Sequence, residues 1–380
     1  MTEQERLWLW LNYGTEHNVK LFNSILNGFD SIEEAHECAV KGERGAFLEL
    51  SDGVWKRLTD AADERFMARY TGWLSRHKIG VATLLSENYP ALLKEISDPP
   101  SLLFYRGDLN PDVEFPIAII GSRSCTSYGK DIARQFGRQL VEKGATVVTG
   151  LAAGIDSYAA CGALDATDAQ MPVIGVLGCG IDVIYPNNNA YLYDGVAERG
   201  ALITEFLPKT QPLSYNFPIR NRLISGLSLG VLVVEAGERS GASITAGYAL
   251  EQGRDVFAVP GRITDVMSAT TNRMIQRGEA KPVFAVSDIL CEYMEGILEL
   301  PYNATAQKIP FSSLTEIEKQ IYSELIKGEK NSDELYDSIN CSIADLHSAL
   351  TSMEFSGIIK QLPGKVFACD TIRTKVVADD

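Results

Sequence analysis

The amino-acid sequence predicts an α/β protein whose central part is a doubly wound, mostly parallel sheet of the Rossmann-like type. Short apolar runs compatible with buried strands recur in this part, and segments with helical periodicity, such as residues 128–144, separate them. Strands that are apolar throughout and alternate with helices are typical of a parallel sheet covered on both faces. The runs lie at residues 116–121, 145–150, 172–178, 201–206, 230–236 and 255–261.

A chain of 380 residues is long for one hydrophobic core, so we expect two or three domains. Residues 1–75 predict a small helical domain of the SAM or helical-hairpin type, because LWLWL, LFNSIL and SIEEAHECA have helical apolar spacing. Ser31 and Glu34 have the spacing of a capping box, and Gly14 and Gly28 are expected to separate short helices. This domain is either a structural cap or a contact with a nucleic-acid backbone.

The Rossmann-like domain is expected to span residues 76–295. Residues 296–311 lack sustained periodicity and contain two prolines, which indicates a linker. Residues 312–370 predict three helices and a two-stranded hairpin, the winged-helix arrangement, and residues 371–380 a tail. The first of these helices is expected to begin at a cap formed by Ser313 with Glu316.

The third helix of the predicted winged-helix domain, at residues 342–356, is a poor surface for the major groove of a DNA duplex. It contains Asp345 and Glu354 but no Lys or Arg. We therefore expect this domain to contact a protein or to regulate the chain rather than to read bases.

The charge of the chain is unevenly distributed. Its formal net charge is -15, but residues 115–290 hold 15 Lys and Arg against 16 Asp and Glu, which leaves -14 on the flanks. Binding of a polyanion needs local positive potential, which the acidic composition of the whole chain does not suggest. The central domain is close to neutral, so it could carry a local basic face.

Neither a membrane span nor an export signal is indicated by the sequence. It has no apolar run of about 18 residues, and its N-terminus lacks the pattern of a signal peptide, so we expect a soluble cytoplasmic protein. The seven cysteines are scattered and form no CxxC pair, which predicts reduced thiols rather than disulfides or a zinc site. They are Cys38, Cys125, Cys161, Cys179, Cys291, Cys341 and Cys369.

Four strand-to-helix loops of the central domain predict a phosphate-rich ligand, because loops at the carboxyl ends of parallel strands favour anions. No loop matches the GxGxxG or GxxxxGK[ST] fingerprint, so no dinucleotide or nucleoside-triphosphate cofactor is expected. The loops are GSRSCTSYG at 121–129, TGLAAGID at 149–156, LGCGIDVIYP at 177–186 and EAGERSGASITAG at 235–247.

Binding is expected at these loops rather than hydrolysis. Residues 115–290 contain no histidine that would act as a general base or a metal ligand, and we expect neither a catalytic residue nor a metal. Two carboxylates of the loops, Asp156 and Glu235, are interpreted as helix caps or arginine partners. The chain's four histidines are His17, His36, His77 and His347.

The central region resembles DNA-processing protein A, the DprA/Smf family, over about 200 residues. The segments that carry this resemblance are NYPALLKEISDPPSLLFYRGDL, AIIGSRSCTSYG, TGLAAGID, LGCGIDVIYP, the run from ITEF to AVPG at 203–261, and TNRMIQRGEA at 271–280. The resemblance implies a DNA-binding protein and not an enzyme. Such a protein binds and protects incoming single-stranded DNA, forms homodimers and higher assemblies, and helps to load the RecA recombinase for DNA recombination in natural transformation of competent cells.

The resemblance also implies the residues that contact DNA. The segment NFPIRNRLISG at 216–226 is expected to form a turn before the strand at 230–236, with its arginines beside the loop of Arg123 and outside the core. Phe217 would offer a face for base stacking, and the arginines would bridge phosphates. The implied DNA-binding residues are Gly121, Ser122, Arg123, Gly178, Lys209, Phe217, Arg220, Asn221 and Arg222.

The chain departs from the family at several positions where family members often have a basic residue, a histidine or a serine. It has Ala153, Ala160, Cys161 and Cys179 at these positions. In addition, SATTN at 268–272 replaces a segment that contains glycine in the family. Two other functions are therefore kept as alternatives. One is a nucleotide-handling enzyme like the phosphoribohydrolases, whose PGGxGT loop is replaced here by GERSGAS. The other is a scaffold that keeps the fold without DNA affinity.

Overall fold

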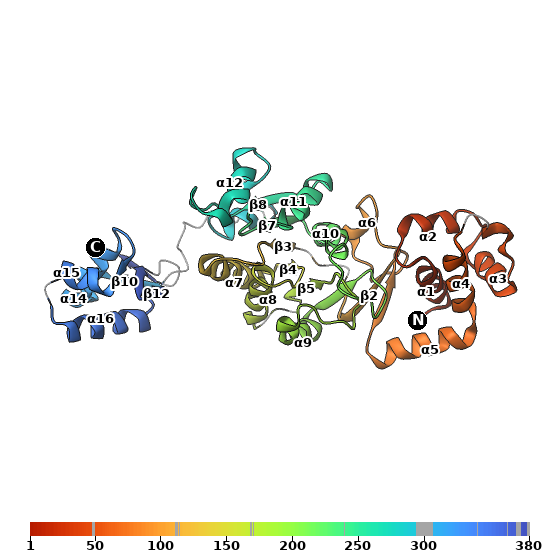
Figure 1. Ribbon diagram of the computed structural model, residues 1–380, viewed down its shortest axis with the longest axis horizontal. Coiled ribbons are helices and arrows are strands. Elements are labelled where there is room, and N and C mark those ends of the chain that lie inside the picture. The colour runs from red at the N-terminus through yellow and green to blue at the C-terminus, as the bar shows by residue number, and fades with distance from the viewer. Residues whose placement is uncertain are drawn as a thin grey trace. The chain divides into compact units, whose positions relative to one another are not determined.

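The computed structural model describes residues 1–47, 50–110, 113, 115–167, 169, 171–238, 240–293, 307–339, 341–362, 364–369 and 374–377. The chain divides into two compact units, Met1–Glu295 and Gly296–Asp380 (Figure 1). No helix within the described ranges is both long enough and apolar enough to cross a membrane. All seven cysteines are free thiols. The finer domain boundaries expected from the sequence stay a prediction.

The first unit begins with a group of helices around a small apolar core. Trp10 is buried and donates from its indole N–H to the carbonyl oxygen of Leu58 at 2.9 Å, which joins α1 to α4. The expectation that Gly14 separates two helices is wrong, because Gly14 lies inside α1 and leaves room for Leu58: a Cβ there would lie 2.2 Å from Cδ2 of Leu58. These elements are α1 (Glu3–Thr15), α2 (Val19–Leu26), α3 (Ile32–Lys41), η1 (Arg44–Phe47), α4 (Asp52–Ala62) and α5 (Glu64–Arg76).

The cap expected at the start of α3 is present in part. The hydroxyl of Ser31 accepts a hydrogen bond from the Glu34 N–H at 3.2 Å. The Glu34 carboxylate accepts from the N–H of Asp30 at 2.9 Å and not from that of Ser31, so the capping box is not reciprocal. Helix α3 therefore has an ordinary serine N-cap.

A nine-stranded sheet forms the centre of the first unit, which confirms the prediction of a mixed α/β fold with a large, mostly parallel sheet. Its order is β1-β2-β6-β5-β4-β3-β7-β8-β9. The strands from β6 to β9 in this order pair in parallel, whereas β2 is antiparallel to both β6 and β1. The strands are β1 (Gly80–Thr83), β2 (Leu102–Gly107), β3 (Pro116–Ile120), β4 (Thr146–Thr149), β5 (Val173–Val176), β6 (Ala201–Thr204), β7 (Gly230–Val233), β8 (Asp255–Ala258) and β9 (Lys281–Pro282).

Helices cover both faces of this sheet. Figure 1 shows α7, α8 and α9 on one face and α10, α11 and α12 on the other, as in a doubly wound fold. The chain builds β4, β5 and β6 on one side of β3 and then returns to place β7 on the other side. The helices after β1 are α6 (Ala91–Lys94), α7 (Ser127–Glu142), α8 (Ile155–Asp165), η2 (Asn187–Asn189), α9 (Ala190–Arg199), α10 (Asn216–Gly226), α11 (Ala242–Glu251), η3 (Val266–Ser268), α12 (Ala269–Gln276) and α13 (Ser287–Leu290).

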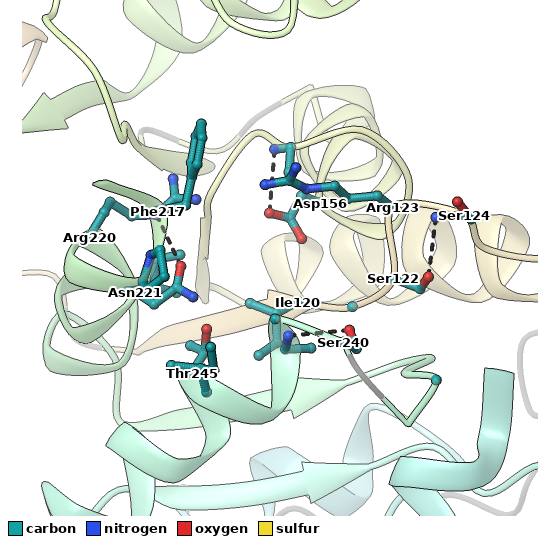
Figure 2. Close-up of a pocket in the computed structure, with 18 of the residues that line it drawn as sticks. Ile120, Ser122, Arg123, Ser124, Asp156, Phe217, Arg220, Asn221, Ser240 and Thr245 are labelled. Atoms are coloured by element: carbon teal, nitrogen blue, oxygen red, sulfur yellow. Dashed lines mark hydrogen bonds between the residues drawn. The ribbon is translucent and has the colours of Figure 1, made fainter. Parts of the chain in front are cut away.

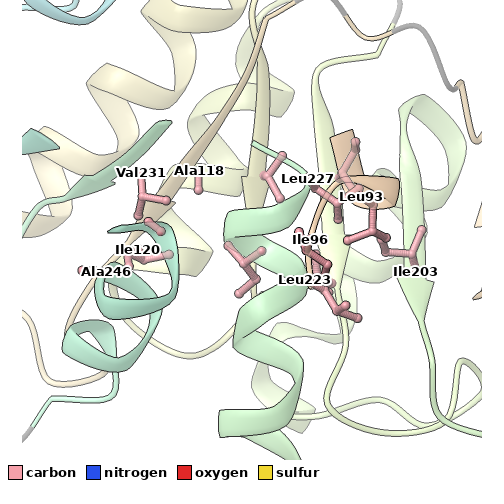
Figure 3. Close-up of a cluster of buried hydrophobic side chains, with 14 of the residues drawn as sticks. Leu93, Ile96, Ala118, Ile120, Ile203, Leu223, Leu227, Val231 and Ala246 are labelled. Atoms are coloured by element: carbon pink, nitrogen blue, oxygen red, sulfur yellow. The ribbon is translucent and has the colours of Figure 1, made fainter. Parts of the chain in front are cut away.

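One layer of the core lies between the sheet and helices α10 and α11 (Figure 3). Leu223 of α10 and Leu227, the C-cap of that helix, belong to the same buried cluster as Leu93 of α6 and Ile203 of β6. Gly226 lets α10 approach closely, since a Cβ there would lie 2.8 Å from Cγ2 of Ile96. This packing fixes the position of α10, on which several of the expected site residues lie.

The described residues of the second unit form three α-helices, a three-stranded sheet of order β11-β13-β12 and a parallel pair of β10 with β14. The N-cap of its first α-helix is Thr315, which forms a reciprocal capping box with Glu318, so the cap expected at Ser313 and Glu316 is displaced by two residues. The elements are β10 (Gln307–Pro310), η4 (Phe311–Ser313), α14 (Glu316–Leu325), β11 (Lys330–Asn331), α15 (Ser332–Ser338), α16 (Ile343–Phe355), β12 (Ile359–Leu362), β13 (Val366–Cys369) and β14 (Thr374–Val377).

The two segments expected to lack regular structure each contribute a strand to that parallel pair. Strand β10 lies in the expected linker and β14 in the expected tail, and Ile309 and Val376 pack against the core of the unit. The expected linker up to residue 306 lies outside the described residues, as do residues 371–373 and 378–380 of the tail. Short strands of this kind carry too little periodicity to be detected in a sequence.

Candidate functional site

A cavity of about 630 Å³ lies where β3 and β7 end, at the change of direction in the strand order. A change of this kind leaves a crevice outside the carboxyl ends of parallel strands, where ligands bind in open α/β sheets. The loop after β3, the loop after β7 and helix α10 form its walls. Figure 2 shows Arg123 and Phe217 on opposite sides of this cavity with their side chains pointing toward each other.

The loop after β3 is held tightly by its backbone. A Cβ on Gly121 would lie 2.6 Å from Cγ1 of Ile155, so only glycine fits there. The N–H of Ser122 donates to the carbonyl oxygen of Glu235 at 2.7 Å, and the Ser122 hydroxyl accepts from the Ser124 N–H at 3.1 Å. The loop is therefore rigid, while the side chain of Arg123 within it is exposed to solvent.

Glu235 supports this loop and is not free for chemistry. It is buried, and its carboxylate accepts from the N–H of Thr126 at 2.9 Å and from the Thr126 hydroxyl at 2.5 Å. Thr126 is in turn the N-cap of α7. The carboxylate therefore joins the end of β7 to the start of α7, which is the capping role expected from the sequence.

The segment NFPIRNRLISG forms helix α10 and not a turn before β7, so the expectation for it is wrong. Its arginines are also buried and not exposed: Arg220 is 3% and Arg222 is 6% exposed. The error has a physical cause, because the pattern of this segment has no single apolar face, and its charged residues are balanced by partners that are distant in the sequence.

Arg220 is fixed between two strands. Its guanidinium donates to the carbonyl oxygen of Gly150 at 2.9 Å and to that of Val176, and its Nε donates to the amide oxygen of Asn221 at 3.2 Å. A Cβ on Gly150 would lie 2.7 Å from Nη2 of Arg220, so the glycine gives the guanidinium its space. Burial lowers the pKa of Arg220 while the nearby Asp156 raises it.

Asp156 lies at the base of the same cavity. Burial raises the pKa of its carboxyl to about 6, while the positive charge of Arg220 and the N–H of Ala152 oppose that shift. The N–H of Ala152 donates to it at 3.4 Å (Figure 2). Its negative charge offsets that of Arg220, so among the described residues that line the cavity Arg123 is the exposed arginine.

Arg222 points away from the cavity. Its guanidinium donates to the Glu205 carboxylate at 2.5 Å and forms an ion pair with Asp98 at 3.1 Å. Burial raises the pKa of Glu205 to about 7, and the Arg222 guanidinium opposes that rise. Arg222 therefore holds α10 against the sheet, and the structure does not bring it together with Arg123.

Phe217 is the centre of the wall formed by α10. The guanidinium carbon of Arg123 lies 5.1 Å and that of Arg220 5.9 Å from its ring centroid, and the Tyr185 ring lies 5.4 Å away. A Cβ on Gly178 would lie 2.7 Å from Cδ1 of Phe217, so this glycine lets the ring rest on the loop after β5. Arg123, Phe217 and Tyr185 form an aromatic and cationic surface suited to stacking with planar groups, and the buried Arg220 lies behind the Phe217 ring.

Lys209 lies outside this group. Its ammonium nitrogen is 5.6 Å from the ring centroid of Trp73 on α5, and its backbone N–H donates to the Asp182 carboxylate at 2.7 Å. The structure thus brings together Gly121, Ser122, Arg123, Phe217, Arg220 and Asn221 around one cavity, with Gly178 behind the Phe217 ring. It places Lys209 and Arg222 elsewhere.

The sequence analysis missed three residues that shape this cavity. Tyr185 adds a second ring, Gly150 makes room for Arg220, and Thr245 of α11 lines the far wall. Tyr185 lies in the segment LGCGIDVIYP and Gly150 in TGLAAGID. The aromatic residue and the glycine in these two expected ligand loops could therefore have indicated them from the sequence. Thr245 lies in the segment EAGERSGASITAG, whose hydroxyl residues were the corresponding signal, although the structure places it inside α11.

No histidine lines the cavity within the described part of the chain, and that part contains no cluster of side chains able to hold a metal ion. The ring centroid of His17 lies 4.7 Å from that of Phe206, and neither residue lines the cavity. Burial and the charge of Arg222 lower the pKa of His17 to about 4. The carboxylate of Glu238, at the mouth, pairs with Arg273 at 3.1 Å.

The family model described as DNA recombination-mediator protein A matches residues 80–294. Protein Smf of Escherichia coli is 36% identical over 93% of this chain and 96% of its own length. The DNA processing protein DprA of Bacillus subtilis is 41% identical over 57% of this chain and 72% of its own length.

Two solved structures are also similar to this chain. The X-ray structure of DNA processing protein A from Streptococcus pneumoniae has a TM-score of 0.63 and 33% identity, and covers 77% of this chain and 99% of that one. A structure of DNA processing protein A from Helicobacter pylori, described as giving insight into its single-stranded DNA binding mode, has a TM-score of 0.51 and 28% identity. It covers 57% of this chain and 98% of that one.

Proposed function

This chain belongs to the DNA recombination-mediator protein A family, the DprA/Smf proteins, and from that premise we propose that it is a DNA-processing protein that binds single-stranded DNA with its Rossmann-like domain. The observation that carries the proposal is the Phe217 ring beside two guanidinium groups at the edge of a cavity, with Arg123 exposed at its rim.

The geometry suits an unpaired strand better than a duplex. A base that is not stacked in a helix has a free face, and aromatic side chains bind such faces without regard to sequence. Phe217 and Tyr185 offer rings, and Arg123 offers an exposed guanidinium for a phosphate. Ser122 and Gly121 hold the Arg123 loop, while Arg220 and Asn221 orient α10 from inside the fold.

The proposed role is that of a recombination mediator and not of an enzyme. The chain would protect incoming single-stranded DNA in the cytoplasm and help to load the RecA recombinase in natural transformation, acting as a homodimer or a larger assembly. Family membership supports this proposal, and so does the cavity, where Asp156 and Glu238 are each balanced by an arginine.

The flanking parts have separate roles in this proposal. Residues 1–75 form the small helical domain and residues 312–370 a winged-helix domain that contacts a protein. The exposed surface of α16 includes Asp345 and Glu354 and neither Lys nor Arg, which supports a protein partner over a DNA duplex.

The proposal is tested by fluorescence anisotropy on the full chain with a labelled oligo(dT) and a duplex of equal length, at two salt concentrations. We expect the single strand to bind more tightly, with an affinity that falls as salt rises. Arg123→Gln should weaken binding by about 12- to 160-fold, which corresponds to the range of about 1.5 to 3 kcal/mol for a hydrogen bond to a charged group. Lys143→Gln, which removes an exposed cation far from the cavity in sequence, is the matched control.

Equal binding of the wild type and Arg123→Gln would contradict the proposed site. If the chain bound neither the single strand nor the duplex, the result would support the alternative of a scaffold without DNA affinity. Release of free base from nucleoside monophosphates, in the absence of oligonucleotide binding, would instead support the nucleotide-handling alternative.

A further inference from the structure

Helix α5 carries a row of exposed arginines that form no ion pair with an acidic residue in the described part of the chain. Arg65, Arg69 and Arg76 are spaced by four and seven residues, which places them on one face of the helix, opposite the buried Met67 and Leu74. The row extends along about 16 Å of the helix axis, at 1.5 Å per residue.

The lack of partners is unusual in a chain of net charge -15. Within the described residues, Arg65, Arg69, Arg76, Lys78 and Lys209 form no ion pair, although many other arginines of the first unit do. Acidic residues do lie near the row: Asp63 and Glu64 begin the helix, and Asp182 accepts from the backbone N–H of Lys209. None of them offsets the charge of the row by direct contact.

The row is connected to the cavity by a continuous set of contacts. The loop after β5 rests on Phe217 at Gly178. At Gly180 the same loop lies so close to Lys209 that a Cβ on Gly180 would be 2.6 Å from the backbone nitrogen of Lys209. The Lys209 ammonium then lies over the ring of Trp73, 5.6 Å from its centroid. Trp73 is four residues after Arg69 and three before Arg76, so it borders the row directly.

We propose that this surface, formed by Arg65, Arg69, Arg76, Lys78, Lys209 and Trp73, is a second binding site for the sugar-phosphate backbone of single-stranded DNA, continuing the path of a strand that leaves the Phe217 cavity. The inference rests on the proposed function, because it extends the same strand. Guanidinium groups suit phosphates, and the indole of Trp73, which is half-buried, suits a base, so the chemistry matches one polyanion with free bases. The proposed site also includes Lys209, so that this residue would contact DNA although it does not reach the cavity.

The test uses the full chain and two labelled oligo(dT) probes, of about six and about thirty nucleotides. Arg65, Arg69 and Arg76 are replaced by glutamine, which is nearly as good a helix former as arginine. The long probe should bind the triple variant about tenfold more weakly at low salt, and the slope of log affinity against log salt should become shallower by about 2, because each phosphate contact with a single strand contributes about 0.7. The short probe should bind as it does to the wild type.

The matched control replaces Lys20, Lys56 and Lys143 with glutamine. These are exposed cations without ion pairs in the described structure, so the control loses the same net charge away from α5. An equal loss in this control, an unchanged affinity of the triple variant for the long probe, or an equal loss for the short probe would each overturn the inference. If the wild type binds neither probe, the proposed function itself fails.

A second measurement needs no substitution and so does not depend on the variant folding. Amide hydrogen exchange of residues 64–78 in the wild-type chain should slow when the long probe is added and should not change with the short probe. The same exchange rate with both probes would contradict the inference even if the variant is unstable.

Discussion

The guanidinium carbon of Arg123 lies 5.1 Å from the ring centroid of Phe217, although 94 positions separate the two residues in the sequence. Arg220 lies 5.9 Å from the same centroid, but it is buried, whereas Arg123 is exposed. The two arginines therefore have different roles. Arg123 is available to a ligand, and Arg220 fixes the helix that presents the ring.

Replacing Phe217 with leucine should weaken binding of single-stranded DNA about 5- to 150-fold, since stacking of a base on an aromatic ring contributes about 1 to 3 kcal/mol. Leucine keeps an apolar side chain beside Gly178, so the fold should be little affected. Titration of labelled oligo(dT) by anisotropy measures the change. Tyr215→Leu is the control, because Tyr215 is an exposed aromatic residue next to α10 that does not line the cavity; a similar loss there would contradict the role of Phe217.

Replacing Arg220 with alanine should lower the free energy of unfolding by about 3 to 5 kcal/mol, the range for a buried charge whose partners are left alone. Two backbone carbonyls and Asp156 would lose their cation. Arg123→Ala should change stability by less than about 0.5 kcal/mol, as for other surface residues. Urea denaturation of both variants tests this difference, and equal stabilities would show that Arg220 does not support the fold.

Replacing Gly178 with alanine should displace the Phe217 ring, because the new Cβ would lie 2.7 Å from its Cδ1. We expect a severalfold loss of affinity for single-stranded DNA with the α/β fold retained, measured by anisotropy and circular dichroism. Gly247→Ala is the matched control, because no atom lies within 4 Å of a Cβ at that position of α11. An unchanged affinity in Gly178→Ala would indicate that the ring position is unimportant.

The stability of the chain should depend on pH through Glu205. Its folded pKa of about 7 exceeds its ordinary value of 4.5, chiefly because of burial, while Arg222 lowers it and Asp98 raises it. The stability gained from the protonated group is fully present below about pH 4.5 and is lost as pH rises through about 7. Relative to Glu205→Gln, the free energy of unfolding of the wild type should therefore fall by about 1.4 kcal/mol per unit of pKa shift, or about 3 kcal/mol in total, as pH rises across this range.

Urea denaturation of the wild type and Glu205→Gln at a series of pH values between 4 and 8 measures this dependence. The comparison removes the contribution of all other titrating groups that the two proteins share. A difference in stability that stays constant with pH would show that Glu205 has an ordinary pKa in the folded chain.

The strands of the sheet could be predicted because their pattern is local. Each of the six apolar runs contains one of the strands β3 to β8, since a strand buried on both faces must be apolar throughout. Helix α10 could not be recognised, because its buried face includes Asn216, Arg220 and Arg222, which look solvent-exposed in the sequence. Their partners lie in other segments, so no local pattern reveals that these charges are balanced.

The sequence by itself determined the α/β class and the loops that surround the cavity, because glycine-bounded loops and apolar strands are encoded by neighbouring residues, whereas Phe217 was expected only from the family resemblance. Only the tertiary structure decided which arginine is free. The change of direction between β3 and β7 brings the two loops and α10 together, and pairing with Glu205 and with the carbonyl oxygens of Gly150 and Val176 removes Arg222 and Arg220 from solvent. Burial and pairing depend on residues far apart in the chain, so they arise only once the chain has folded.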